Sequence, residues 1–288
     1  MDRLRRLALQ MVRSRLAQAG LTALGRTVAR PLVAKYKDPS LQPPIERLEF
    51  IASIPKEAQV LEIGPFDRPW LLGPQVRYFD VLSQDDLKAR AEAEPKRNPD
   101  GCPVIHYVSP TGDLSVVHDE FAAVFSSHCI EHQPDLIHHL REVGRLLRPG
   151  GRYHLIIPDK RFCFDHFLPE TRAADVQAGK GRSLHTEKAV TEHVLGTTHN
   201  VNILHWLGFH GRPVGENSAA QARNEDALRR TRKGEYVDVH AWQFTPTSFR
   251  ALIQQLFEAG EINLRPTTVH NTGFGRIEFM AVLTRSAA

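Results

Sequence analysis

The stretch Val60-Leu-Glu-Ile-Gly-Pro-Phe-Asp-Arg-Pro-Trp70 decides the fold of this 288-residue chain. It starts as a short apolar run that contains one acid, Glu62, and then turns at Gly64 and a proline. Such a run predicts a buried strand whose carboxyl end faces a ligand, as in open α/β sheets. A carboxylate, in place of the lysine of a phosphate-binding loop, favours a cationic or hydroxyl-rich ligand. A purely structural strand end is the alternative interpretation.

A second predicted strand, 76–80, also ends in an acid, Asp80. In a Rossmann-like unit this acid reaches ribose hydroxyls, so we expect Asp80 and the Gly64 turn to form one ligand site; a helix cap is the alternative role. Strands and helices then alternate, which predicts an α/β fold with a doubly wound, mainly parallel sheet. The other predicted strands are 104–108, 121–127, 153–157, 264–270 and 276–284, and the predicted helices are 45–52, 84–98, 134–148 and one that begins at Thr245-Pro246.

The composition, with 41% apolar and 24% charged residues, predicts one sizeable core with an insertion. No run of about 18 uncharged apolar residues predicts a membrane-spanning helix. The N-terminus lacks the apolar segment of a secretory signal, so we expect a cytoplasmic location. Three widely spaced cysteines, Cys102, Cys129 and Cys163, predict reduced thiols and not disulfides or a Cys-x-x-Cys metal site.

Positive charge is concentrated in residues 1–37, which carry nine Lys or Arg and one Asp, while the rest has a net charge of −4. That acidic body has no aromatic-plus-basic module, so we expect no nucleic-acid partner. The spacing over 3–33 predicts basic amphipathic helices. These helices either pack on the body or on a second subunit of a homodimer, or make a weak contact with an anionic membrane surface. Residues 38–44, with three prolines, predict a linker.

About eighty residues between Asp159 and Val239 interrupt the α/β pattern. An insertion beside the ligand-binding strand ends is placed to form a lid and to select a substrate. Its basic cluster is interpreted as a solvated surface, with a phosphate- or carboxylate-binding site as the alternative. We expect no metal, because the spacing of its histidines does not put neighbours on one helix face. The basic residues are Arg223, Arg229, Arg230, Arg232 and Lys233, and the histidines are His193, His199, His205 and His210.

Five motifs in this order and spacing resemble those of the class I S-adenosylmethionine-dependent methyltransferases, over roughly 55–170 and 240–285. They are Val60–Pro65, Asp80, Asp113-Leu114, Ser126-Ser-His-Cys-Ile-Glu-His132 and Arg145-Leu-Leu-Arg-Pro-Gly-Gly-Arg-Tyr-His-Leu-Ile-Ile-Pro158. Within the family, Pro158-Asp-Lys-Arg-Phe-Cys-Phe-Asp165 and His240-Ala-Trp-Gln-Phe-Thr-Pro246 resemble a bacterial subgroup of methyltransferase-domain proteins. One departure stands out, because the family's usual second glycine, two residues after Gly64, is Phe66 here.

The resemblance implies a Rossmann-like sheet of seven strands in the order 3-2-1-4-5-7-6, with the seventh antiparallel and helices on both faces. It also implies the cofactor S-adenosyl-L-methionine. The cofactor-binding residues carried over from the family are Glu62, Ile63, Gly64, Pro65, Asp80, Val81, Asp113, Leu114, Ser127 and His128. We expect a helical extension and linker over 1–44, and a methyltransferase domain over 45–288 with an insertion at about 160–239.

The implied reaction is methyl transfer to an oxygen or nitrogen of a small-molecule or saccharide-type acceptor. This displacement needs orientation and, for some acceptors, a base. His132 is the nearest candidate base, and the alternatives are His128, Asp159, Asp165, His166 and His240. Candidate acceptor contacts are Lys160, Arg161, Asp165, His166 and Trp242. Two other functions stay open: a non-catalytic scaffold, favoured by Phe66, and a membrane-associated lipid or quinone methyltransferase, favoured by the basic N-terminus.

Overall fold

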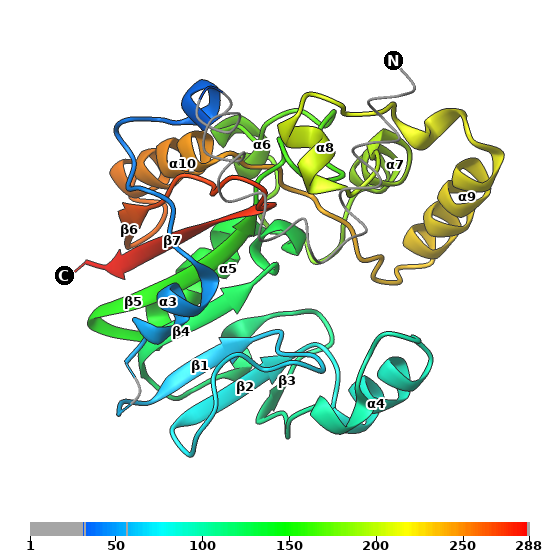
Figure 1. Ribbon diagram of the computed structural model, residues 1–288. Helices are drawn as coiled ribbons and strands as arrows, with labels where there is room; N and C mark the ends of the chain where they lie inside the picture. The colour runs from blue at the N-terminus through cyan, green and yellow to red at the C-terminus, as the bar shows by residue number, and fades with distance from the viewer. Residues whose placement is uncertain (1–30, 32, 56, 287–288) are drawn as a thin grey trace.

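The computed structural model describes residues 31, 33–55 and 57–286, and a seven-stranded sheet forms its centre (Figure 1). The strand order is β3-β2-β1-β4-β5-β7-β6, as expected. Strands β1 to β5 pair in parallel, and β7 is antiparallel to both β5 and β6. The strands are β1 (Val60–Ile63), β2 (Val76–Asp80), β3 (Tyr107–Val108), β4 (Phe121–Ser127), β5 (Leu147–Pro158), β6 (Leu264–Val269) and β7 (Glu278–Arg285).

Both faces of the sheet are covered, because side chains alternate along each strand. In β4, Val124 belongs to the main core, together with α5 (Leu136–Leu146) and α10 (Pro246–Glu258). Its neighbour Phe125 points to the opposite core, which contains α3 (Arg47–Ala52). The apolar runs of the inner strands are therefore buried from both sides. Helix α10 begins after the N-cap Thr245, as its Thr-Pro pair predicts.

Several helix and strand boundaries differ from those predicted from the sequence. Strand β5 begins at Leu147 and not at 153, so Pro149-Gly150-Gly151 lies inside a strand and does not end a helix. A register shift between Phe121 and Ala123 absorbs the extra residues, and Gly150 takes a φ of 74° there. Helix α5 begins at Leu136, after the N-cap Asp135 and two residues later than Pro134 suggested. The predicted helix 84–98 ends at Glu92, and the third strand is only two residues long.

The insertion has its own helices, which Figure 1 shows grouped at one end of the sheet. Val190, Ala227, Val237 and Val239 form a small separate core between two of them. The two ends of the insertion meet where Asp159 pairs with Phe244 in an isolated β-bridge. The elements are α6 (Ala173–Gln177), α7 (Glu187–Gly196), α8 (Asn202–Trp206), η4 (Val214–Glu216) and α9 (Ser218–Arg232); elsewhere the chain forms α4 (Gln84–Glu92), η1 (Pro99–Gly101), η2 (Leu114–Val116) and η3 (Ile130–His132).

Residues 38–44, predicted as a linker, pack along the sheet. Leu41 is buried in the main core, and Gln42 donates its backbone N–H to Val269 O at 2.9 Å. Just before this segment, the Tyr36 ring packs edge-on against Phe162 and Trp206. The amphipathic helices predicted over 3–33 lie outside the described residues except for 31 and 33. Within the described part of the chain, no helix is long and apolar enough to cross a membrane.

Candidate active site

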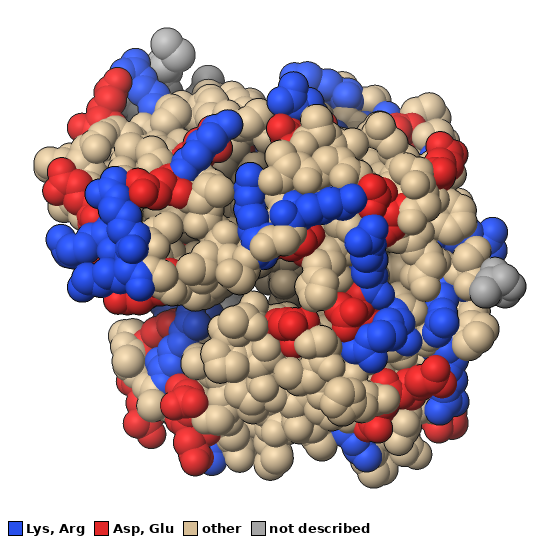
Figure 2. Space-filling view, turned by 180° about the vertical axis from the view of Figure 1, so that it is seen from behind, with Lys and Arg blue, Asp and Glu red and all other residues tan. Residues whose placement is uncertain are grey.

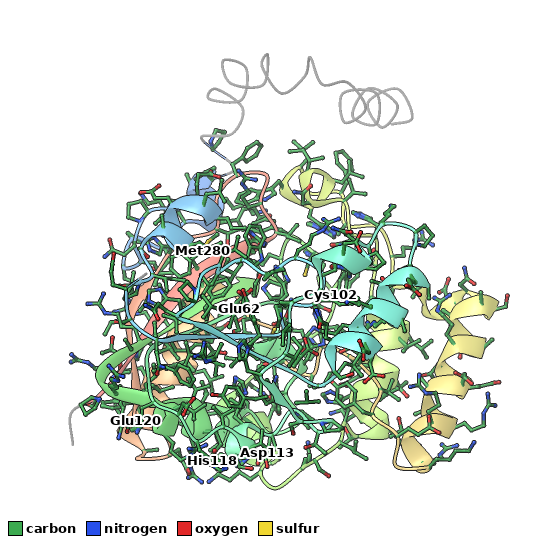
Figure 3. The ribbon with its side chains drawn as sticks, turned by 90° about the horizontal axis from the view of Figure 1, so that it is seen from below. Glu62, Cys102, Asp113, His118, Glu120 and Met280 are labelled. Carbon is green, nitrogen blue, oxygen red and sulfur yellow. The ribbon has the colours of Figure 1, made fainter. Side chains whose placement is uncertain are left out.

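Glu62 lies in the interior at the end of β1 (Figure 3). Its side chain is almost fully buried, and its two carboxylate oxygens accept the backbone N–H groups of Trp70 and Leu71 at 2.9 and 2.8 Å. Burial raises the Glu62 pKa to about 7, against the effect of these two hydrogen bonds. Glu62 therefore fixes the loop that follows Gly64.

The turn after β1 keeps the backbone shape that its sequence predicts. Gly64 has a φ of 70°, and a Cβ there would lie 2.7 Å from Cys129 Sγ at the end of the neighbouring β4. Phe66 also adopts a left-handed φ, of 46°. The Phe66 ring lies between the guanidinium groups of Arg90 and Arg97, at 5.1 and 4.5 Å. It also packs on the small apolar cluster formed with α4, so the ring occupies the α4 side of the turn.

Asp80 ends β2 beside this turn. The Gly64 N–H donates to the carbonyl of Phe79, the residue before Asp80, at 2.9 Å. The Asp80 carboxylate accepts the backbone N–H of Leu82 at 3.2 Å, while burial raises its pKa. The helix-cap alternative for Asp80 is wrong, because Ser83 caps α4 with a capping box. The structure thus brings the Gly64 turn and Asp80 together.

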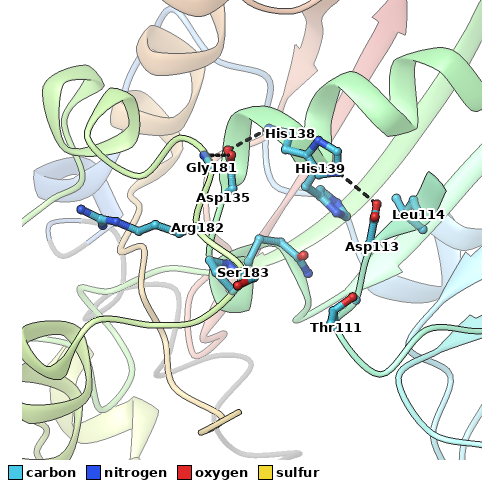
Figure 4. Close-up of a pocket in the computed structure, with 12 residues that line it drawn as sticks. Thr111, Asp113, Leu114, Asp135, His138, His139, Gly181, Arg182 and Ser183 are labelled. Atoms are coloured by element: carbon cyan, nitrogen blue, oxygen red, sulfur yellow. Dashed lines mark hydrogen bonds and ion pairs between the residues drawn. The ribbon is translucent and has the colours of Figure 1, made fainter. Parts of the chain in front are cut away.

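A cavity of about 280 Å³ lies beside Asp113 and Leu114 (Figure 4). Its walls come from three segments: the loop after β3, the start of α5, and residues 181–183 of the insertion. The Asp113 carboxylate contacts His138 Nε2 at 3.0 Å, and Asp135 accepts the Gly181 N–H at 2.6 Å. The two predicted residues therefore lie at a cavity that the insertion helps to close.

At the end of β4, His128 has a φ of 54° and follows Ser127. Among the described residues, only His128 and Phe66 combine a side chain with a left-handed φ, a strained conformation that is concentrated at functional sites. His128 Nε2 lies 2.8 Å from Glu278, which also pairs with Arg47. Burial would raise the Glu278 pKa, but these two partners lower it to about 2.

Three histidines surround a buried glutamate beyond β4; we call Glu131, His128, His132 and His240 the Glu131 cluster. Glu131 is 0% exposed, and neither of its carboxylate oxygens accepts a hydrogen bond from any described residue. Its Oε1 lies 3.7 Å from His128 Nδ1, 3.7 Å from His132 Nε2 and 3.8 Å from His240 Nε2. The structure thus places two of the predicted catalytic residues, His132 and His240, on one carboxylate.

Two acidic residues of the insertion contact His132 and His240 on the side away from Glu131. His132 Nδ1 lies 2.8 Å from Asp238, and His240 Nδ1 lies 2.5 Å from Asp165. The His132 contact lowers the Asp238 pKa to about 2. The His132 pKa is lowered by burial, but Asp238 and Glu131 raise it more, so the net shift is upward. Asp165, predicted as a catalytic or acceptor residue, therefore orients the His240 ring.

The third catalytic candidate, Asp159, lies elsewhere. It is fully buried, and its carboxylate binds Arg161 and the Thr272 hydroxyl, the latter at 2.5 Å. The Lys160 ammonium donates to the carbonyl of His166 at 2.9 Å. These contacts, at the point where the insertion leaves β5, favour a structural role for Asp159, Lys160 and Arg161. They do not bring these residues to the Glu131 cluster.

Trp242 lines a second cavity, of about 360 Å³, between the insertion and the body. Its indole N–H donates to the carbonyl of Gln133 at 2.5 Å. Pro134 and Arg182 line both this cavity and the one beside Asp113, so the two cavities are neighbours. Trp242 is thus the predicted acceptor residue that lies at a cavity.

The insertion's histidines divide into two groups. His193 accepts the His240 backbone N–H at 3.1 Å, and burial lowers its pKa to about 4. His205 and His210 stack with His166, whose ring centroid lies 3.6 Å from that of His210, and His199 stacks on His205. Sequence reasoning missed this division, because it joins residues of separate loops. The stacked group is His166, His199, His205 and His210.

The basic cluster lies on and just after α9, where Figure 2 shows Lys and Arg gathered at the left edge of the molecule. Three of its arginines pair with acids: Arg229 with Asp226, Arg230 with Glu235, and Arg232 with Glu187. This pairing supports the interpretation of a solvated surface.

Comparison with known proteins identifies the domain. Residues 72–155 match the family described as "Methyltransferase domain". Residues 72–155 belong to a methyltransferase domain. The sheet around them has the strand order of the class I S-adenosylmethionine-dependent fold, and the cofactor of that family is S-adenosyl-L-methionine. No curated protein matches the sequence.

Among solved structures, the chain is similar to a methyltransferase from Aquifex aeolicus, with 13% identity over 88% of this chain and 96% of that one, and a TM-score of 0.41. A second, from Methanosarcina mazei, has 12% identity over 85% and 100% of the two chains, and a TM-score of 0.41. The CcbJ methyltransferase from Streptomyces caelestis has 23% identity over 40% of this chain, with a TM-score of 0.28. The match spans about half, 52%, of CcbJ.

Proposed function

We propose that this methyltransferase domain acts on an oxygen or nitrogen of a small-molecule or saccharide-type acceptor. The observation that carries the proposal is the position of the Glu131 cluster at the end of β4, next to the Gly64 turn. Cys129 links the two: its Sγ lies 3.4 Å from the Ile63 carbonyl of β1, and Glu131 follows two residues later. A group bound at the turn therefore lies within reach of His132 and His240.

The residues at the strand ends suit the cofactor. S-adenosylmethionine supplies a methyl group on a positively charged sulfonium. The close approach of β1 and β4 at Gly64 leaves no room for a side chain at this position. A ligand can lie against the exposed backbone of such a glycine turn. The Asp80 carboxylate would accept hydrogen bonds from the ribose hydroxyls of the cofactor. The cavity beside Asp113 and Leu114 would hold its adenine ring. Ile63, Pro65, Val81, Ser127 and His128 complete the proposed contacts.

Glu62 has a different proposed role. Its carboxylate already accepts two backbone N–H groups, so it shapes the loop around the cofactor and does not bind the ligand's charge directly. The Phe66 ring stacks on the α4 side of the turn, a position that supports a catalytic domain over a non-catalytic scaffold.

His132 is the proposed base for the acceptor proton. Its side chain is 23% exposed, whereas the Glu131 beside it is fully buried. Asp238 fixes the orientation of its ring and stabilises the protonated form. The insertion supplies Asp238 and lines both cavities, so we propose that residues 160–239 select the acceptor while 45–288 as a whole form the methyltransferase domain. A homodimer and a weak membrane contact through residues 1–37 stay as predictions.

An untargeted assay tests this function. The full chain is incubated with a metabolite extract and S-adenosylmethionine that carries an isotope label in its methyl group. We expect one labelled small molecule with wild-type protein and much less of it with Asp80→Ala at a limiting cofactor concentration. Cofactor binding without any labelled product, across extracts and a saccharide panel, would support the scaffold instead. Product that forms only with liposomes would support a membrane-associated lipid or quinone methyltransferase.

A further inference from the structure

Glu131 lacks the partners that a buried carboxylate needs. A carboxylate removed from water without hydrogen bonds or a counter-charge is strongly unfavourable. Glu62, one strand away, accepts two backbone N–H groups, but Glu131 accepts none from the described residues. The nearest histidine nitrogens, at 3.7 and 3.8 Å, are too distant for hydrogen bonds. The charge of Glu131 is therefore balanced either by protonation of these histidines or by a cation bound between them.

The contacts that His132 and His240 make on the side away from Glu131 show which ring nitrogen carries the proton. Carboxylates only accept, so the nitrogens of His132 and His240 that face Asp238 and Asp165 carry hydrogen. In the neutral imidazole the other nitrogen then has a free lone pair. Both Nε2 atoms thus direct lone pairs toward the Glu131 carboxylate. Lone pairs and a carboxylate repel one another unless a cation lies between them.

We propose that a divalent transition-metal ion binds between Glu131, His132 and His240. Their ligand atoms all lie within 4.8 Å of one another. Histidine ligands in metal sites usually donate their second N–H to a carboxylate; here Asp165 accepts that of His240, and the Asp238 carboxylate lies 2.8 Å from His132 Nδ1. The proposal reverses the expectation of no metal, which considered only histidines of the insertion. The signal in the sequence is Glu131-His132 followed 108 positions later by His240.

The separations suit such an ion. Ligands about 2.1 Å from a metal lie about 3.4 Å apart in a tetrahedron, so the two histidine–Glu131 separations of 3.7 and 3.8 Å require closure by about 0.3–0.4 Å, and the two histidine nitrogens, which lie within 4.8 Å of each other, must also approach. Two imidazoles and a carboxylate favour Zn²⁺, Fe²⁺ or Co²⁺, because Mg²⁺ and Ca²⁺ prefer oxygen ligands.

The proposed metal site would have an open coordination position on one side. His128 and His132 are 30% and 23% exposed, while Glu131 and His240 lie beneath them. Catalytic metal sites keep such an open position, and structural sites do not. If the proposed function holds, the ion would polarise an acceptor hydroxyl at this position, and His132 would then serve as a ligand in place of the base. The metal site itself does not depend on that function, so it is tested without cofactor or acceptor.

Tag-free protein, stripped with a chelator, is titrated with Zn²⁺ by calorimetry and with Co²⁺ by visible absorption. We expect about one equivalent to bind to the wild type, and an affinity at least about 100-fold lower in His240→Ala and Glu131→Gln. Mg²⁺ should compete only weakly. No stoichiometric binding, or equal affinity in these two variants, would contradict the site.

His210→Ala is the matched control, because it removes a histidine from the stacked group, which could also hold a metal. It should bind Zn²⁺ like the wild type. If His210→Ala loses the ion and His240→Ala keeps it, the stacked histidines are the site and the proposal is wrong. Cofactor binding to the stripped protein is measured in parallel. Cofactor binding without metal binding overturns this inference and leaves the proposed function intact.

A second variant covers the case in which Glu131→Gln does not fold. Asp238→Asn keeps all the proposed ligands, and the Asp238 side chain is 55% exposed, so the fold should persist. Changing such a partner typically weakens metal binding by about 10–100-fold. An unchanged Zn²⁺ affinity in folded Asp238→Asn would argue against a metal held by His132.

Discussion

Glu62 and Glu131 are two buried glutamates at the ends of adjacent parallel strands, and their surroundings differ completely. Glu62 binds the backbone N–H groups of residues eight and nine positions later. Glu131 binds no described donor and faces three histidine rings from two distant segments. The first arrangement is complete in the protein alone, and the second is not. The comparison teaches that burial of a carboxylate does not define its role; its unfilled hydrogen bonds do.

The largest effect should come from Glu131. In Glu131→Gln we expect the rate of methyl transfer to fall by about 10²–10⁴-fold, because the cluster loses the charge that organises His132 and His240. Affinity for S-adenosylmethionine should change by less than about threefold. Both are measured on the same preparation, with kinetics and calorimetry. A comparable loss of cofactor affinity would mean that Glu131, like Glu62, mainly shapes the turn.

The second effect is a pH dependence that arises from Glu62. Its pKa rises on folding from 4.5 to about 7, so the folded state binds this proton more tightly. That stabilisation is fully present below pH 4.5 and is lost as the pH rises through about 7, a change of about 3 kcal/mol. Urea unfolding of Glu62→Gln should lack this slope. The exposed Glu49→Gln is the control and should keep it.

The third effect tests the cofactor side of the comparison. Asp80→Ala should weaken S-adenosylmethionine binding by about 10–100-fold, because hydrogen bonds to a charged group are worth about 1.5–3 kcal/mol. Asp85→Ala removes an exposed acid from the first turn of α4 and should leave the affinity unchanged. Calorimetry on both variants measures their affinity for S-adenosylmethionine. Equal affinities in Asp80→Ala and wild type would remove Asp80 from the proposed site.

The smallest effect concerns Phe66. Phe66→Leu loses the stacking of two guanidinium groups and should reduce the free energy of unfolding by about 1 kcal/mol. Because the ring packs on the α4 side, cofactor affinity should stay within about twofold. Urea unfolding and calorimetry measure the two quantities. A large loss of affinity would show that the ring, and not only the backbone of residue 66, contributes to the cofactor site.

The sequence predicts the sheet well because its signals are local. The acid and glycine of 60–65 and the acid at 80 belong to short strands whose order the family resemblance supplies. Strand β5 was predicted too short, because a bulge at Gly150 continues a strand where Pro-Gly-Gly normally ends an element. The role of Phe66 could not be predicted, because it depends on Arg97, thirty-one residues away.

The Glu131 cluster was predicted only in part. His132 and His240 were selected one at a time as candidate bases, but no periodicity relates a short turn after β4 to the end of an eighty-residue insertion. Asp165 and Asp238 hold the two rings from opposite ends of that insertion. Asp159 was selected for its place after β5, yet its carboxylate is bound by Arg161 and Thr272.

The bridge between Asp159 and Phe244 has a consequence for any replacement of the insertion. Because the insertion leaves and rejoins the body at one point, its replacement by another segment would not alter the strand pairing. The insertion carries Asp165 and Asp238, so such a replacement would also remove the groups that contact His240 and His132. A replacement at this point would therefore change the proposed acceptor contacts and the surroundings of the Glu131 cluster together, whereas point mutations inside the insertion could change them separately.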